Sequence, residues 1–67
     1  MKKVTLLIPV YNEEAMLPAL YKRLIELINR NNTYEWEILF INDGSSDGTL
    51  ESIRQLRQTD KRVNYVN

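Results

Sequence analysis

The chain has 67 residues, of which nine are Lys or Arg and nine are Asp or Glu, so its formal net charge is zero. Nucleic-acid-binding domains usually carry a basic excess, and we therefore expect no nucleic-acid partner. Cys and His are both absent, which excludes disulfides, Cys-based zinc sites and histidine acid–base chemistry. No stretch approaches the roughly 18 apolar residues that a membrane span needs. We expect a single small domain over residues 1–67.

The first predicted element is a strand over residues 4–10. This run is almost continuously apolar, a pattern typical of a strand that is buried on both faces of a parallel sheet. Pro9 has no N–H group to give to a neighbouring strand, and it therefore suits the end of this element.

A helix is predicted over residues 13–30, because apolar side chains recur there at steps of three and four. These side chains share one face: Leu17, Leu20, Tyr21, Leu24, Leu27 and Ile28. Asn12 is placed to cap the first turn, and Glu13 and Glu14 suit the positive end of the helix dipole. Pro18 lies in the early turns, where it can introduce a kink.

A second strand and a second helix are predicted after a polar break. Residues 36–42 are rich in aromatic and branched side chains, which favour a strand, and the Asp-Gly pair at 43–44 ends it. Ser46 or Asp47 can cap a helix over residues 48–58. The buried face of this helix is predicted to carry Leu50, Ile53, Leu56 and the aliphatic stem of Arg57.

Residues 63–66 form the third predicted strand and complete a β-α-β-α-β order. Helical crossovers imply parallel strands and right-handed connections. Two crossovers in the same direction give the strand order 3-2-1 and place both helices on one face. The predicted fold class is therefore α/β, a fragment of a three-layer, Rossmann-like domain.

The helix-free face of this sheet is predicted to be apolar as well. The first two strands carry apolar side chains in both alternating sets: Leu7, Leu39 and Ile41 on one face, and Leu6, Ile8, Ile38 and Phe40 on the other. We expect the bare face to be covered by sequence outside these residues, or by self-association of the chain. The domain is accordingly predicted to be truncated.

Polar residues gather where the first two strands end. In an open parallel sheet, ligands bind at the carboxyl ends of the strands. Tyr11 offers an aromatic face and a hydroxyl there, and Asp43 offers a carboxylate that can accept from a base or a ribose. Both loops lead into helix N-termini, which favour phosphate. The alternative is structural: Asp43 belongs to an ordinary turn, and Glu13 and Glu14 are ordinary first-turn acids.

Three other nucleotide or metal motifs fit less well. The first turn has no glycine-rich Rossmann fingerprint, and no P-loop is present. Residues 43–48 match the first half of a calcium loop, but Arg54 stands where the bidentate Glu belongs. With no nucleophile–base pair and no Asp-x-Asp string, the chain offers no catalytic residue and no metal ligand set.

The two strand-end segments resemble the N-terminus of a family 2 glycosyltransferase with the GT-A fold. Residues 4–14 (VTLLIPVYNEE) resemble its first strand and turn, and residues 41–49 (INDGSSDGT) resemble its second. The Glu-Glu pair and the Asp-Gly-Ser-x-Asp-Gly-Thr string resemble the branch that glycosylates polyprenyl phosphates, such as dolichyl-phosphate mannosyltransferase and the bactoprenol glucosyltransferases. The resemblance covers the whole chain.

The resemblance also implies roles for individual residues. Five of them are expected to line the nucleotide-sugar pocket: Pro9, Tyr11, Glu13, Ile41 and Asp43. In the family, the residue matching Ile41 packs beside the base, and the one matching Asp43 hydrogen-bonds the base or the ribose. Asp47 and Thr49 are expected to cap the following helix.

For the whole enzyme, the resemblance implies a UDP- or GDP-sugar donor, a polyprenyl phosphate or glycan acceptor, and inversion by direct displacement. Mg²⁺ or Mn²⁺ is expected, with its ligands outside these residues. The expected location is cytoplasmic, with the whole protein associated with the cytoplasmic face of a membrane. Residues 1–67 are expected to be inactive alone. The alternative is a non-catalytic α/β module that binds a nucleotide or a protein partner.

Overall fold

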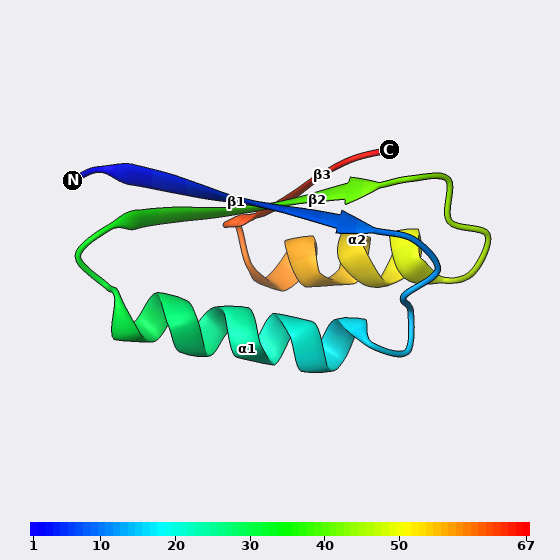
Figure 1. Cartoon of the computed structure of the whole chain (residues 1–67), viewed down its shortest axis with the longest axis horizontal. Coiled ribbons are helices and arrows are strands. Elements are labelled where there is room, and N and C mark those ends of the chain that lie inside the picture. Colours follow the sequence, from blue (N-terminus) through cyan, green and yellow to red (C-terminus); the bar gives the residue numbers. More distant parts are fainter.

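The computed structural model describes residues 1–67 as a three-stranded parallel sheet with two helices packed on one face (Figure 1). The elements follow in the order β1 (Lys3–Val10), α1 (Leu17–Arg30), β2 (Glu35–Asn42), α2 (Thr49–Thr59) and β3 (Val63–Val66). This order confirms the predicted β-α-β-α-β fold. The strands lie in the order β1-β2-β3, which is the predicted 3-2-1 order read from the other edge.

The register of the sheet brings the ends of β1 and β2 together. Every residue of β1 has a partner in β2, from Lys3 opposite Glu35 to Val10 opposite Asn42. The strand β3 is shorter and pairs only with residues 38–41 of β2. Because the strands are parallel, the loops after β1 and β2 leave the sheet from the same edge, which we call the carboxyl edge.

The core lies between the sheet and the two helices. Its buried side chains are Val10, Leu17, Leu24, Ile28, Ile38, Phe40, Ile53 and Val63. Leu27 was predicted on the buried face of α1 but is 42% exposed, because it lies about 80° around the helix from Leu17 at 100° per residue. Leu50 and Leu56 are half-buried, while Arg57 is exposed.

Neither helix combines the length and the apolar character that crossing a membrane requires.

The predicted start of the first helix is wrong by four residues. The helix α1 begins at Leu17 rather than at residue 13, and the N–H groups of Met16 and Leu17 both donate to Glu13 O, at 3.0 Å, in a preceding turn. Asn12 does not cap it, because the N-cap position is Met16; the backbone of Asn12 is left-handed, with φ 48°. Pro18 lies in the first turn of α1, where a proline costs no helix hydrogen bond.

The helix-free face of the sheet has an apolar half and a polar half. As predicted, Leu7, Leu39 and Ile41 alternate with the core residues and face away from the helices; Leu7 is 63% exposed. Nearer the start of the strands, Glu37 accepts from Thr5 Oγ1 at 3.0 Å and from Asn64 Nδ2 at 2.8 Å. These hydrogen bonds, led by that from Thr5, lower the pKa of Glu37.

Candidate functional site

The candidate site is formed by two loops at the carboxyl edge, residues 11–16 after β1 and residues 43–48 after β2. Both loops lie at the same end of the molecule, on the right in Figure 1. The Asp43 N–H donates to Val10 O at 3.1 Å, so backbone pairing continues one step beyond the end of β2. The loops therefore start from a fixed position relative to each other.

Asn12 connects the tips of the two loops. Its N–H donates to Ser45 Oγ at 3.0 Å, and its Oδ1 accepts from the Ser46 N–H at 2.7 Å. Its left-handed backbone is one that Asn tolerates better than most residues. Ser45 Oγ in turn donates to Asn42 Oδ1, so the tips are tied back to the end of β2.

Thr49, Asp47 and Gly48 hold the next two residues of the first loop. The Glu13 N–H donates to Thr49 Oγ1 at 2.9 Å, and the Glu14 N–H donates to Asp47 Oδ2 at 3.2 Å. The Gly48 N–H donates to Glu14 Oε1 at 3.0 Å. A Cβ at Gly48 would lie 2.4 Å from Glu14 Oε2, so glycine at this position lets the Glu14 carboxylate approach the backbone.

The predicted capping roles are half confirmed. Asp47 Oδ1 accepts from the Thr49 N–H at 3.0 Å at the start of α2, although the N-cap position itself is Gly48. Thr49 does not cap; it is completely buried and its hydroxyl donates to Asp47 while accepting from Glu13. The hydrogen bond from the Thr49 hydroxyl is the main reason that the pKa of Asp47 is lowered.

The structure brings four of the five predicted pocket residues together at the carboxyl edge. Pro9 and Ile41 are opposite each other in the β1–β2 register. Tyr11 is 59% exposed, and Asp43 is exposed with no hydrogen bond to its carboxylate. Alternation along the strands places Pro9 and Ile41 on the helix-free side of the sheet, and Tyr11 and Asp43 each follow two residues later, just beyond the strand ends.

Glu13, the fifth predicted pocket residue, has a different environment. It is half-buried, and its N–H donates to Thr49 Oγ1. It lines a hollow of about 210 Å³ beside α1 together with Met16, Ala19, Leu20 and Arg23, whereas none of the other four predicted pocket residues lines a hollow.

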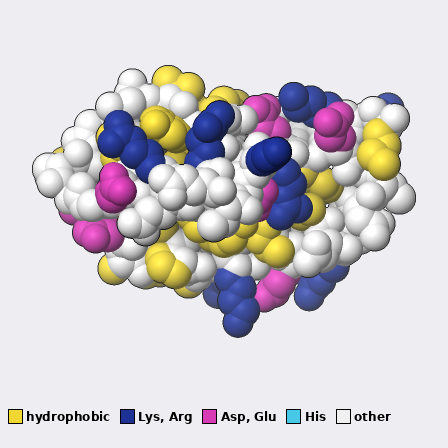
Figure 2. Space-filling view, turned by 180° about the vertical axis from the view of Figure 1, so that it is seen from behind, with side chains coloured by type: hydrophobic (Ala, Val, Ile, Leu, Met, Phe, Trp, Pro, Cys, Tyr) yellow, Lys and Arg dark blue, Asp and Glu magenta, His cyan; other side chains and the backbone are white.

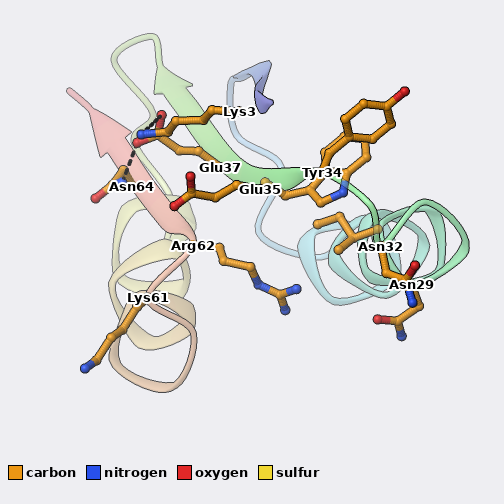
Figure 3. Close-up of a pocket in the computed structure, with 11 residues that line it drawn as sticks. Lys3, Asn29, Asn32, Tyr34, Glu35, Glu37, Lys61, Arg62 and Asn64 are labelled. Carbon is orange, nitrogen blue, oxygen red and sulfur yellow. Dashed lines mark hydrogen bonds and ion pairs between the residues drawn. The ribbon is translucent and has the colours of Figure 1, made fainter. Parts of the chain in front are cut away.

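The largest hollow of the molecule lies at the opposite, amino edge of the sheet (Figure 3). It measures about 560 Å³, and residues from the start of the strands and the end of α1 line it, among them Lys3, Glu35 and Asn29. Figure 3 shows Arg62 reaching into it from the start of β3. No cavity of the chain is lined by Pro9, Tyr11, Ile41 or Asp43, so the candidate site is an open surface.

The carboxyl edge does not form a metal centre. No group of three or more His, Cys, Asp or Glu side chains in the chain is placed to hold a metal ion. Both oxygens of Asp47 accept hydrogen bonds from protein groups, so the calcium-loop alternative loses one of its carboxylates to the scaffold. Residues 1–67 therefore do not fit a divalent cation by themselves.

Three curated relatives share this region of sequence. A prophage bactoprenol glucosyl transferase homolog of Escherichia coli is 44% identical over 61 residues, which are 91% of this chain and 20% of that protein. A bactoprenol glucosyl transferase of Shigella phage SfV gives the same identity and coverage. An undecaprenyl-phosphate 4-deoxy-4-formamido-L-arabinose transferase of Aeromonas hydrophila is 47% identical over 53 residues, 79% of this chain and 16% of its own length.

The chain thus spans about a fifth of the length of the bactoprenol relatives that it matches. The family model for glycosyl transferase family 2 matches residues 5–67. This range includes both loops of the carboxyl edge and all five elements apart from the first residues of β1. The chain belongs to glycosyl transferase family 2.

Proposed function

We propose that this chain forms part of the donor-nucleotide pocket of a glycosyltransferase. The enzyme would transfer a sugar from a UDP- or GDP-sugar to a polyprenyl phosphate at the cytoplasmic face of a membrane. Family membership supports the reaction class. The names of relatives that act on bactoprenol or undecaprenyl phosphate support the acceptor class.

The observation that carries the proposal is the pair of unpartnered side chains, Tyr11 and Asp43, on rigidly connected loops. A binding site works best when its groups are held in place before the ligand arrives. The hydrogen bonds of Asn12 and Thr49 provide this rigidity. Asp43 would accept from the base or the ribose, and Tyr11 would stack on the base.

Pro9 and Ile41 form the apolar base of the proposed pocket. They are cross-strand partners on the helix-free side, two residues before Tyr11 and Asp43. Glu13 differs from the other four predicted residues, because it is half-buried and lines the hollow beside α1. We therefore place Glu13 at the pocket's rim, with a role for its backbone in fixing the first loop.

The proposed reaction is a direct displacement with inversion. An acceptor phosphate oxygen forms a bond to the anomeric carbon, while the bond from that carbon to the nucleoside diphosphate breaks. The acceptor oxygen is already anionic and needs no strong base. Mg²⁺ or Mn²⁺ would neutralise the diphosphate, and we place its ligands outside residues 1–67, since no suitable cluster occurs here.

Asp43→Ala is expected to weaken nucleotide binding by about 1–3 kcal/mol, the scale of leaving a buried hydrogen-bond partner unpaired. The measurement is an NMR titration of the chain with UDP and with GDP, with and without Mg²⁺. We expect shifts confined to residues 9–14 and 41–45. Asp43→Asn keeps the shape but not the charge, and Glu26→Gln, an exposed residue of α1, is the control.

Two results would contradict the proposed pocket. Nucleotide shifts that persist in Asp43→Ala would remove Asp43 from the site. Shifts that cluster elsewhere, for example around the hollow at the amino edge, would favour the non-catalytic binding module instead. The base whose titration gives the lower dissociation constant identifies the preferred donor class.

We also propose that the isolated chain self-associates through its helix-free face. Leu7 is 63% exposed and Val66 is 52% exposed, next to half-buried Leu39 and Ile41. Light scattering is expected to show a dimer or a larger species, and Leu7→Lys is expected to shift it towards monomer because it places a charge in this apolar surface. Lys22→Gln on α1 serves as the control. A well-folded, strictly monomeric chain would contradict this expectation.

A further inference from the structure

Two arginines of α2 extend along the open edge of β3. Arg54 and Arg57 are three residues apart, so they lie on the same side of the helix. Arg54 Nε donates to the Tyr65 hydroxyl at 3.3 Å, and Arg57 Nε donates to Asn64 Oδ1 at 3.2 Å. Each guanidinium is therefore anchored through Nε to a neutral group of β3, and no hydrogen bond within the chain uses its terminal nitrogens.

The positive charge of this pair is poorly balanced. Arg57 has no carboxylate within 4.0 Å, and Arg54 has only Glu51, on the same helix, at 3.9 Å. Arg62, by comparison, is paired with Asp60 at 2.8 Å. Seen from behind, the molecule carries several Lys and Arg side chains in its upper half, with a smaller number of Asp and Glu side chains among them (Figure 2).

The two arginines border adjoining hollows in the surface. One, of about 230 Å³, is lined by Arg54, Arg57, Gln58 and Tyr65. The other, of about 330 Å³, is lined by Arg57, Asn64 and Tyr65. Arg57 and Tyr65 belong to both, so a small ligand in either hollow lies beside a guanidinium without a carboxylate partner.

The edge strand adds a backbone donor. The Ile38 N–H donates to Arg62 O at 2.8 Å, so residues 62 and 64 direct their backbone groups towards β2. Because these directions alternate along a strand, Tyr65 directs its N–H towards the open edge, where the two hollows lie. The site thus offers two guanidinium groups and one N–H. Glu51 has the only carboxylate within 4.0 Å of either guanidinium, and Glu37 lies behind Asn64, whose amide separates it from Arg57.

We propose that Arg54, Arg57 and the Tyr65 backbone bind a phosphate group. Guanidinium groups bind phosphate oxygens in pairs of parallel hydrogen bonds, and two anchored guanidiniums can take two edges of one phosphate. The site is separate from the loops of the carboxyl edge, whose hydrogen bonds involve neither arginine. The competing explanation is that the two arginines only prevent another chain from pairing with the exposed edge of β3. In that case the arginines would show no preference for phosphate over chloride.

The test compares two sources of phosphate and uses no nucleotide, so it is independent of the proposed donor pocket. Inorganic phosphate is titrated into the chain at constant ionic strength, with chloride as the reference, while the Arg Nε–H and Tyr65 amide NMR signals are followed. In parallel, the chain is sedimented with vesicles of phosphatidylcholine alone and with vesicles that contain phosphatidic acid. Binding of free phosphate alone would support the site and identify a soluble phosphate as its ligand. Binding of phosphatidic acid alone would support the site and identify a lipid headgroup as its ligand. Binding to neither would overturn it.

The Arg54→Gln/Arg57→Gln double variant is expected to bind at least about tenfold more weakly, since it loses charged hydrogen bonds. Lys22→Gln/Arg30→Gln removes the same charge from exposed positions of α1 and is expected to bind normally. Arg54→Lys/Arg57→Lys keeps the positive charge, and it provides a second test of the site if the Gln variant does not fold. We expect it to bind weakly, because lysine cannot form the paired contacts. If the Lys variant bound phosphate as well as the unchanged chain, or if the α1 control lost as much affinity as the Gln variant, net charge alone would explain the binding. Either result would overturn the site.

Discussion

Replacing Asp60 by Asn is expected to lower the free energy of unfolding at pH 7 by about 2 kcal/mol. Asp60 is 9% exposed and lies between α2 and β3. Its carboxylate accepts from the Tyr21 hydroxyl at 2.5 Å and from Arg62 Nε and Nη2 at 2.9 and 2.8 Å. It therefore links α1 to the start of β3, and no other side-chain hydrogen bond joins these two segments.

The free energy of unfolding is expected to fall in acid, because the pKa of Asp60 is lowered in the folded state. The hydrogen bonds from Arg62 lower the pKa of Asp60 from 3.8 to about 2, so the folded state favours the carboxylate more than the unfolded state does. The stabilisation is complete above the unfolded pKa and is lost as the pH falls towards about 2. For a chain of this size, whose total stability is a few kcal/mol, this loss is large.

Urea unfolding followed by Trp36 fluorescence, at pH 7 and at steps between pH 4 and pH 2, measures both effects. Asp60→Asn is expected to lose less stability on acidification than the unchanged chain. Part of the slope will remain, because the pKa values of Glu37 and Asp47 are also lowered. Glu26→Gln is the matched control on an exposed part of α1. An Asp60→Asn chain with the unchanged acid slope would show that the Tyr21–Asp60–Arg62 cluster does not stabilise the fold.

The sheet and its topology could be predicted because their determinants are local. The apolar run at 4–10 and the aromatic and branched run at 36–42 each specify a strand without help from the rest of the chain. Because a helical segment connects each strand to the next, the strands are expected to pair in parallel. The predicted bounds of β1 and β2 were each one residue short, and β3 matched over residues 63–66.

The start of α1 could not be predicted because distant residues determine it. Asn12, Glu13 and Glu14 have the composition of a helix start, yet their N–H groups donate to Ser45, Thr49 and Asp47 in the other loop. These partners are more than 30 residues away in the sequence. A local pattern contains no information about such contacts, and here they replace the first turn of the predicted helix.

The candidate site could be predicted only in part, because its supporting contacts also join residues that are far apart in the sequence. Strand ends alone place Pro9, Tyr11, Ile41 and Asp43 at the carboxyl edge. The supporting contacts of Glu14 and the buried hydroxyl of Thr49 were missed, since the second motif was interpreted as a helix cap. Gly48 was the one residue that could have indicated these contacts. A glycine just before a helix allows another group to approach its backbone closely, and in the structure this group is the Glu14 carboxylate. Much of the motif therefore stabilises the loops.

Thr49→Val tests this supporting role directly. Valine has nearly the shape of threonine but no hydroxyl, so the completely buried site loses the acceptor for the Glu13 N–H and the donor to Asp47. Leaving these groups unpaired is expected to lower the free energy of unfolding by about 1–3 kcal/mol. Hydrogen exchange at the Glu13 and Glu14 amides is expected to accelerate by more than the global loss explains. The pKa of Asp47 is expected to rise towards its ordinary value, since the Thr49 hydroxyl is the main cause of its depression.

Two variants sharpen the comparison. Thr49→Ser keeps the hydroxyl, so it should retain the protection of Glu13 and the low pKa of Asp47 even though it removes a methyl group. Thr33→Val makes the same chemical change at an exposed position, where no measurable effect is expected. If Thr49→Val kept normal exchange at Glu13 and an unchanged Asp47 pKa, the hydroxyl would not hold the loops together. If all three readouts moved and nucleotide shifts at residues 9–14 weakened with them, the same contacts that order the first loop would also prepare it for the donor.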